Sequence, residues 1–209
     1  MLYSGSYFYP PRTEARISYD DNVVLAQWRS YADVIAQYKI NGQRNLIKVS
    51  PDRKIEFWNR HKERQKYVIP DHIKNYILHI SAVGFWTVWD SELVHYKTKT
   101  IKNLVYIFDC LVWKSKHLIG MTYGDRYKLL PHNFASLDSI GAGNNVVVAQ
   151  NYGSNDWNCM WTEAQKYDWC EGLVVKRTGS SSRLTYGGYP LNNSSFMCRV
   201  RKPGKNMPF

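Results

Sequence analysis

The sequence predicts an α+β fold with mainly antiparallel sheets. Most of its apolar segments are short and rich in β-branched or aromatic residues, which is typical of strands. Only two stretches carry apolar residues at the spacing of a helix, and turn-forming residues separate the segments. The 209 residues suit one domain, and no linker or internal repeat divides them. We therefore expect residues 1–209 to form a single domain.

The expected strands are spread along the whole chain. They cover residues 46–49, 55–58, 85–89, 104–113, 146–149, 173–175 and 196–200. Helices are expected at Asp71–Ile80, where three isoleucines recur at helical spacing, and at residues 161–169. Gly141-Ala142-Gly143 lacks the preceding strand and the third glycine of a dinucleotide-binding turn, so we expect a loop there. Further loops are expected at residues 51–52, 178–183, 187–190 and 203–204.

Basic side chains outnumber acidic ones by 28 to 17, which gives a formal net charge of +11 at pH 7. Such a field attracts polyanions and raises the rate at which they are encountered. The 16 tyrosines and 8 tryptophans suit base stacking as well as an ordinary core. The charge therefore favours a nucleic-acid partner over the alternative that it serves only solubility.

The cysteines and the apolar segments exclude other classes of protein. The four cysteines form no C-x-x-C pair and no zinc-ligand spacing with histidine, so we expect them to be reduced and structural. They are Cys110, Cys159, Cys170 and Cys198. The chain opens on no secretory leader, and its most apolar stretch, residues 76–89, is shorter than the roughly 20 residues of a membrane span. We expect a monomer in the cytoplasm, that of the host if the protein is viral, with no membrane partner.

Six short motifs with candidate functional residues follow one another along the chain. The first is Lys39-Ile40-Asn41-Gly42-Gln43-Arg44, which places a lysine, a glycine turn and an arginine before a predicted strand. The later ones are Trp58-Asn59-Arg60, Asp90-Ser91-Glu92-Leu93-Val94, Tyr106-Ile107-Phe108-Asp109, Glu171-Gly172-Leu173-Val174-Val175-Lys176 and Cys198-Arg199-Val200-Arg201-Lys202. Each motif alone is weak, because short motifs recur by chance, but the ordered series is specific.

In this order the motifs resemble those of the covalent nucleotidyltransferase superfamily, which includes ATP-dependent DNA and RNA ligases and mRNA-capping guanylyltransferases. The first motif of the superfamily runs K-x-D-G-x-R. Its later motifs run S-R, D-G-E, an aromatic-Asp strand, E-G-x-x-x-K and a closing strand with K-x-K. The resemblance covers residues 37–202. It implies a ligase-type nucleotidyltransferase (adenylation) domain that uses ATP and Mg²⁺ or Mn²⁺ and acts on nucleic acid.

The resemblance implies a role for each matching residue. Lys39 matches the nucleophile that attacks the α-phosphate of ATP and then carries AMP, and Glu171 matches a metal-binding acid. Arg44 and Arg60 match arginines that help to hold the nucleotide or the 5′-phosphate. The remaining matches are Glu92 near the ribose or the metal, Phe108 stacked on adenine, Lys176 after the metal-binding acid, and Arg199 and Arg201 at the α-phosphate.

The sequence departs from the superfamily pattern in three respects. Asn41 stands where DNA ligases and capping enzymes usually carry Asp, a position at which RNA ligases vary. Arg199 and Arg201 stand where lysines are expected, and they keep the charge but present it as a planar fork. No OB-fold domain follows the last motif within the 209 residues, so the chain resembles a minimal phage or viral ligase core.

The chemistry of these side chains agrees with the roles implied by the resemblance. A lysine amine is nucleophilic only when neutral, and cationic neighbours, a metal ion or desolvation promote the loss of its proton. Arg44, Arg60 and Lys176 would be such neighbours, and they would also neutralise phosphate charge. Glu92 and Glu171 would together bind Mg²⁺, which prefers oxygen ligands.

The sequence therefore predicts an ATP-dependent polynucleotide ligase that joins 3′-hydroxyl and 5′-phosphate ends at nicks in base-paired nucleic acid through a lysyl-AMP intermediate. Two alternatives stay open. One is a GTP-using mRNA-capping guanylyltransferase, and the other is an inactive nucleotidyltransferase fold that only binds nucleic acid. The choice between DNA and RNA at each end is also open, because it depends on whether a 2′-hydroxyl is read.

Several conspicuous residues have an ordinary structural interpretation. His61 and His95 lack ligand spacing and are expected to be surface or core groups. Residues 97–102 form either a phosphate-contacting turn or a solvated hairpin. Three tryptophans alternate with apolar neighbours and are expected in the core, namely Trp86, Trp89 and Trp113.

Overall fold

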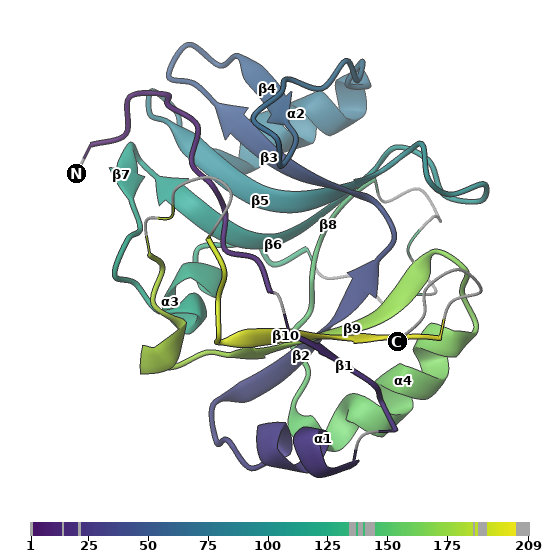
Figure 1. Ribbon diagram of the computed structural model, residues 1–209. Coiled ribbons are helices and arrows are strands. Elements are labelled where there is room, and N and C mark those ends of the chain that lie inside the picture. The colour runs from purple at the N-terminus through teal and green to yellow at the C-terminus, as the bar shows by residue number, and fades with distance from the viewer. Residues whose placement is uncertain are drawn as a thin grey trace.

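Two β-sheets make up the computed structural model, which describes residues 2–13, 15–20, 22–133, 137, 140, 145–185, 187 and 192–203. The four-stranded sheet has the order β1 (Arg16–Ile17), β10 (Met197–Arg201), β9 (Cys170–Arg177) and β2 (Val34–Ile40). The other sheet has the order β4 (Ile55–Trp58), β3 (Gln43–Val49), β5 (Thr87–Val94), β6 (Leu104–Trp113) and β7 (Lys116–His117), and β8 (Val146–Val148) pairs with β6. This six-stranded sheet lies above the four-stranded one in Figure 1.

Helices cover the sheets and bury their apolar side chains. They are α1 (Asn22–Arg29), α2 (Asp71–Ile80), α3 (Tyr123–Tyr127) and α4 (Trp157–Gln165), with the 3-10 turns η1 (Ser154–Asp156) and η2 (Ser180–Ser182). α1 and α4 lie below the four-stranded sheet in Figure 1, where Leu25 and Trp157 join its core. α2 packs Ile73 and Ile77 into the core of the six-stranded sheet. Removing these apolar surfaces from water is the main term that stabilises the fold.

The predicted fold class is confirmed. Among the described strand pairs, only β1 with β10 and β6 with β8 are parallel, and the others are antiparallel. The helix predicted at Asp71–Ile80 is present with those bounds. Trp89 is fully buried, and Trp86 and Trp113 pack partly buried against the same cluster, as expected of core residues. Within the described residues, no helix is long and apolar enough to cross a membrane.

Several expected elements have different bounds in the structure. The helix expected at residues 161–169 is α4, which begins four residues earlier because Trp157, Met160 and Ala164 are buried at helical spacing. The strand expected at residues 85–89 is β5, which continues through Glu92 to Val94. Strand β2 was not predicted, because its polar residues interrupt the apolar pattern. The expected loop at residues 141–143 and most of the one at 187–190 lie outside the described residues.

The chain passes from one sheet to the other through Asn41 and Gly42, between β2 and β3. A Cβ atom at Gly42 would lie 2.5 Å from the Cγ atom of Glu92 and 2.7 Å from the carbonyl oxygen of Leu93. Only glycine fits so close an approach. The glycine of the first motif therefore lets the Lys39 strand pass tightly against β5, between the two sheets.

Two of the β-bulges place a single side chain at the cavity between the sheets. Lys39 pairs with Gly172 and Ile40 with Cys170, so Glu171 is the extra residue of a bulge in β9. In the other sheet Asp90 pairs with Asp109 and Ser91 with Ile107, so Phe108 is the extra residue of a bulge in β6. Bulges often re-aim a side chain next to a functional site.

Gly172→Ala should destabilise the fold, because Gly172 has a φ of +132° and an added Cβ would lie 2.2 Å from the carbonyl oxygen of Val200. We expect the free energy of unfolding to fall by at least about 1–3 kcal/mol, measured by denaturant titration. Gly84→Ala is the control, since Gly84 has a φ of +75° but open space around it. Equal losses in the two variants would mean that the collision with Val200 contributes nothing.

Candidate active site

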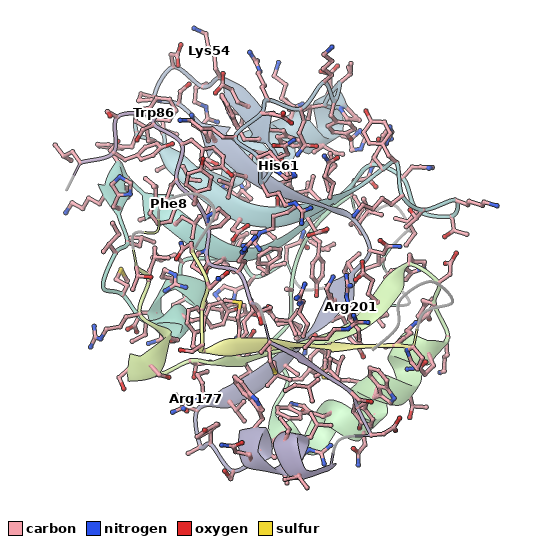
Figure 2. The ribbon with its side chains drawn as sticks, in the orientation of Figure 1. Phe8, Lys54, His61, Trp86, Arg177 and Arg201 are labelled. Carbon is pink, nitrogen blue, oxygen red and sulfur yellow. The ribbon has the colours of Figure 1, made fainter. Side chains whose placement is uncertain are left out.

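A cavity of about 970 Å³ opens between the two sheets and is lined by residues from both of them. All nine candidate residues line it, namely Lys39, Arg44, Arg60, Glu92, Phe108, Glu171, Lys176, Arg199 and Arg201. Figure 2 shows Arg201 beside the four-stranded sheet and His61, which also lines the cavity, beside the six-stranded sheet. A cavity of this size suits a nucleotide-sized ligand.

Glu171 lies at the centre of the cationic side of the cavity. Its Oε2 atom accepts a hydrogen bond from Lys39 Nζ at 2.6 Å and another from Arg201 Nη2. Burial opposes ionisation of Glu171, but Lys39 and Arg201 outweigh it and hold the pKa below its ordinary value. The bulge in β9 therefore delivers an ionised carboxylate directly to the side chain of Lys39.

Glu92 extends into the same cavity from β5, opposite Arg44 on β3. Burial raises the pKa of Glu92 to about 7, although the charges of Lys39, Arg44 and Lys97 oppose the rise. The neighbouring charge of Glu171 adds to it. Burial therefore favours the protonated carboxyl group, and a cationic ligand would favour its ionised form.

Arg44 is fixed in place by an acid on the neighbouring strand. Its Nε atom donates to Asp90 Oδ1 at 2.6 Å, and Nη2 donates both to Asp90 Oδ2 and to the carbonyl oxygen of Pro11, the latter at 2.9 Å. The guanidinium lies 5.0 Å from the centre of the Phe108 ring. Asp90 thus orients Arg44 by a two-pronged pair, which is stronger and more directional than a single charged contact.

Phe108 lies between two cations, because Lys176 Nζ is 5.1 Å from the centre of its ring. Lys176 is also 4.4 Å from the ring centre of Tyr123 and donates to Gln37 Oε1 at 2.7 Å. Burial lowers the pKa of Lys176 to about 7, and the charges of Asp109 and Asp90 oppose this fall. Lys176 is therefore an amine that changes charge near neutral pH inside the cavity.

The other three candidate arginines lie on two segments of the chain. Arg60 is exposed on the turn after β4, where its Nε atom donates to His61 Nε2 at 3.1 Å. Arg199 and Arg201 lie on β10, and both are partly buried. Burial lowers the pKa of Arg199, and the nearby charges of Arg201, Arg16 and Arg12 lower it further. The side of the cavity formed by β10 is therefore strongly cationic.

Two features of the cavity were missed by sequence reasoning. Gln37 is 2 % exposed, and its Nε2 atom donates to Tyr123 Oη, Asn151 Oδ1 and the carbonyl oxygen of Ala149 at 2.9–3.2 Å. Residues two apart on a strand face the same side, so Gln37 could have been predicted to face the cavity with Lys39 only if β2 had been recognised. The segment of residues 9–13 also lines the cavity, and no sequence pattern indicates this.

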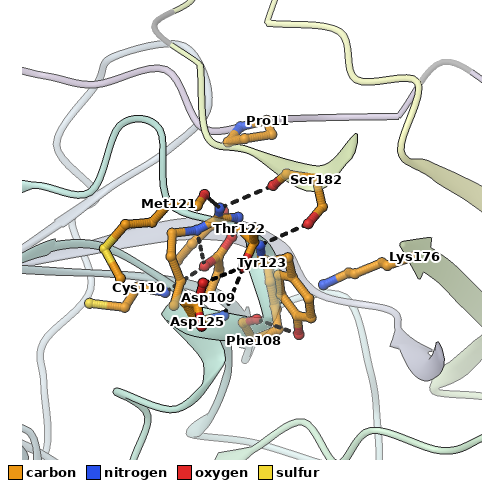
Figure 3. Close-up of polar contacts among 12 residues, drawn as sticks. Pro11, Phe108, Asp109, Cys110, Met121, Thr122, Tyr123, Asp125, Lys176 and Ser182 are labelled. Atoms are coloured by element: carbon orange, nitrogen blue, oxygen red, sulfur yellow. Dashed lines mark hydrogen bonds and ion pairs between the residues drawn. The ribbon is translucent and has the colours of Figure 1, made fainter. Parts of the chain in front are cut away.

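A buried ion pair supports the Phe108 bulge from behind. Arg126 is fully buried, and its Nε and Nη2 atoms donate to the two carboxylate oxygens of Asp109 at 2.9 and 2.7 Å. Arg126 also donates to the carbonyl oxygens of Met121 and Ser182. Figure 3 shows Asp109 together with its chain neighbour Phe108 and with Met121 and Ser182. This pair ties β6 to α3 and η2.

Two other expectations concern the turn at residues 97–102 and the four cysteines. The amine of Lys102 donates to the carbonyl oxygens of His95 and Thr98, so it closes its own turn, while Lys97 lines the cavity. Cys110, Cys170 and Cys198 are buried and Cys159 is exposed, and all four are free thiols as predicted. Within the described ranges, no three His, Cys, Asp or Glu side chains are grouped as a metal site made by protein alone.

The fold is that of solved DNA ligase domains. A mycobacterial DNA ligase D complexed with ATP and MES matches with a TM-score of 0.59 and 15 % identity over 92 % of this chain. The ligase domain of LigD from M. tuberculosis matches with a TM-score of 0.57 and 15 % identity over 93 % of it. The chain spans 60 % and 59 % of the length of those two chains. No protein-family model matches the sequence, and no curated protein sequence matches it.

Gln37→Glu should raise the pKa of Lys176 from about 7, because it places a carboxylate where Gln37 Oε1 now accepts from the amine. The neutral amine would then form only at higher pH. Titration of Lys176 by NMR of ¹³C-labelled lysine measures the midpoint, and melting temperatures check that the fold persists. Gln37→Met is the uncharged control, for which no upward shift is expected. An unchanged midpoint in Gln37→Glu would contradict the assigned contact.

Proposed function

We infer that the protein is an ATP-dependent polynucleotide ligase, which joins a 3′-hydroxyl to a 5′-phosphate through AMP bound to Lys39. The observation that carries this proposal is the ion pair of Lys39 with Glu171, which also binds Arg201, in a cationic cavity of a ligase-type fold. The position of a reactive amine among charges that suit a nucleotide phosphate supports the assignment. The solved neighbour complexed with ATP agrees with it.

The proposed reaction has three steps. The first two transfer AMP, and the third joins the two strand ends. Lys39 first loses its proton to water, and the positive charges of Arg199 and Arg201 in the same cavity would favour this loss. The neutral amine attacks the α-phosphorus of ATP, a P–N bond forms, and the bond to pyrophosphate breaks. AMP then passes to the 5′-phosphate as the P–N bond breaks. The 3′-hydroxyl finally attacks that phosphate, loses its proton and displaces AMP.

The charge of the cavity suits this chemistry. Eight cationic side chains line it against four carboxylates, and two of these carboxylates are engaged with Arg44 and Arg126. Fixed cations stabilise the negative charge that develops on the leaving pyrophosphate, without a cost of reorganisation at the moment of reaction. Arg201, Arg199 and Arg60 would contribute most of this stabilisation at the phosphates, while Lys176 and Arg44 flank Phe108.

The cavity also offers a donor set that fits a divalent cation. Mg²⁺ is usually held by one or two carboxylates together with water and substrate phosphate oxygens. Glu92 and Glu171 are two carboxylates in one cavity, and the lowered pKa of Glu171 keeps that group ionised. They would hold Mg²⁺ or Mn²⁺. Such an ion would supply charge neutralisation at the phosphates.

Base-paired nucleic acid is the proposed partner. A template keeps the hydroxyl and the phosphate side by side and so lowers the entropy cost of joining them. The net charge of +11 supports binding to the phosphate backbone. We propose that residues 1–209 carry out the reaction as one monomeric catalytic unit in the cytoplasm, on DNA, RNA or mixed strands.

Lys39→Ala and Lys39→Arg should both abolish transfer of AMP to the protein. The first removes the amine, and the second replaces it with a guanidinium that stays protonated. The measurement is covalent label from α-³²P-ATP or α-³²P-GTP with Mg²⁺, resolved by denaturing electrophoresis, with mass spectrometry of the labelled peptide. Lys114→Ala is the control, because Lys114 is exposed and does not line the cavity.

The labelling result separates the candidate functions. Label from ATP at Lys39 supports the ligase, and label from GTP alone would indicate a capping guanylyltransferase. A wild-type protein that takes label from neither nucleotide would leave only a nucleic-acid-binding fold. Full labelling of the Lys39 variants would remove the central claim.

Phe108→Ala should weaken ATP binding by about 1–3 kcal/mol, the range found when base stacking on an aromatic ring is lost. Phe57→Ala is the matched control, because Phe57 is 2 % exposed in the core and does not line the cavity. ATP affinity is measured by calorimetric titration and stability by thermal unfolding. Phe108→Ala should mainly lose affinity, and Phe57→Ala should mainly lose stability. Phe57→Ala should lose about 3–5 kcal/mol of stability and little affinity. If Phe108→Ala loses stability alone, its ring is only core.

A further inference from the structure

A compact turn of basic residues follows β4 at the edge of the six-stranded sheet. We call it the basic turn, and it comprises residues 59–66. β4 is the edge strand, and its end is extended by an isolated bridge between Trp58 and Arg64. Gln65 also donates its backbone N–H to the carbonyl oxygen of Phe57 at 2.8 Å. The basic turn is therefore anchored at both ends to the rigid sheet.

The basic turn is ordered by the side chain of Asn59. Its Oδ1 atom accepts from the backbone N–H groups of His61 and Glu63 at 2.8 and 3.1 Å, and its Nδ2 atom donates to Glu63 Oε2 at 2.8 Å. The hydroxyl of Tyr7 donates to the carbonyl oxygen of Asn59 at 2.9 Å and ties the turn to the N-terminal segment. A turn closed by its own asparagine keeps a fixed shape when a ligand arrives.

The charges of the basic turn point outward. Arg60, Lys62, Arg64 and Lys66 are exposed, and the only acid among residues 59–66 is Glu63. Beyond Arg64 the chain alternates, since Lys66 is exposed while Gln65 and Tyr67 turn inward. Within the described residues, the amines of Lys62 and Lys66 have neither a hydrogen bond nor an ion pair. No contact within the fold therefore explains why residues 62 and 66 are positively charged.

The basic turn is continuous with the cavity, because Asn59, Arg60 and His61 line it. Lys62, Arg64 and Lys66 carry the same positive charge away from it along the edge of the sheet. We propose that the basic turn is a nucleic-acid interface, which binds the phosphate backbone of a duplex beside the cavity. The proposal rests on the proposed function and adds the surface that would hold the polynucleotide.

Duplex nucleic acid fits this surface better than a single phosphorylated molecule. The charges are spread over a run of exposed residues outside the cavity, and one phosphate inside it could not reach them. A duplex carries about one negative charge per 1.7 Å of its axis, so it can meet several spaced cations at once. Contacts of this kind position a backbone without reading its sequence.

The test is the double variant Lys62→Gln with Lys66→Gln, which spares the residues that line the cavity. Binding of a nicked duplex, in DNA and in mixed DNA and RNA form, is measured across a salt series. Loss of two phosphate contacts should reduce the slope of log affinity against log salt by about 1.8 and weaken binding on the order of tenfold near 0.15 M salt. Self-labelling with AMP should not change, because neither residue lines the cavity.

The matched control is Lys114→Gln with Lys116→Gln, which removes the same charge. Both lysines are exposed, Lys114 in the turn before β7 and Lys116 on β7, which is the opposite edge of the same sheet. The proposal is supported if only the Lys62 and Lys66 variant loses affinity and slope. Equal losses in both variants would assign the effect to overall charge. Unchanged binding in both would show that the basic turn does not contact the duplex. Either result would overturn the proposed interface. A wild-type protein that binds the duplex but takes no AMP would contradict the proposed function and leave this interface to be judged by the binding data.

Discussion

The arrangement of the cavity depends on one shared carboxylate. Glu171 is the extra residue of the β9 bulge, and its Oε2 atom holds Lys39 from β2 and Arg201 from β10. These strands flank β9 on either side, so the contact joins the three strands across their cavity-facing side chains. The bulge exists because Gly172 can adopt a φ that other residues avoid. A backbone irregularity of one residue therefore decides where the Lys39 amine lies.

The six-stranded sheet uses the same device for the opposite wall. Phe108 is the extra residue of the β6 bulge, so that it and the neighbouring Asp109 can both line the cavity. Asp109 is held by Arg126, which is buried and has no other role in the cavity. Breaking a buried pair leaves an uncompensated charge, at a cost of about 3–5 kcal/mol. The position of the aromatic ring is thus supported by an ion pair behind the sheet.

The sequence predicted the fold class and α2, and it singled out nine residues that all line the cavity, because the order and residue types of short motifs can be read from the sequence. It did not predict β2, since Gln37 and Lys39 replace apolar residues on the side that faces the cavity. It could not predict the bulges at Glu171 and Phe108, because register depends on the partner strand and not on local composition. Arg126 gave no signal at all, as its partner lies 17 residues away and only the fold brings them together.

The charge balance of the cavity explains why a buried lysine is tolerated beside two rings. Arg44 and Arg126 face Asp90 and Asp109, so these four side chains nearly cancel one another. Lys176 has no carboxylate of its own and contacts Gln37 instead, and burial lowers its pKa to about 7. An anionic ligand would favour its charged form, so the binding of a phosphate would draw a proton onto Lys176 and strengthen the attraction. A neutral amine avoids the full cost of a buried charge, and an anion bound beside it would favour the cation.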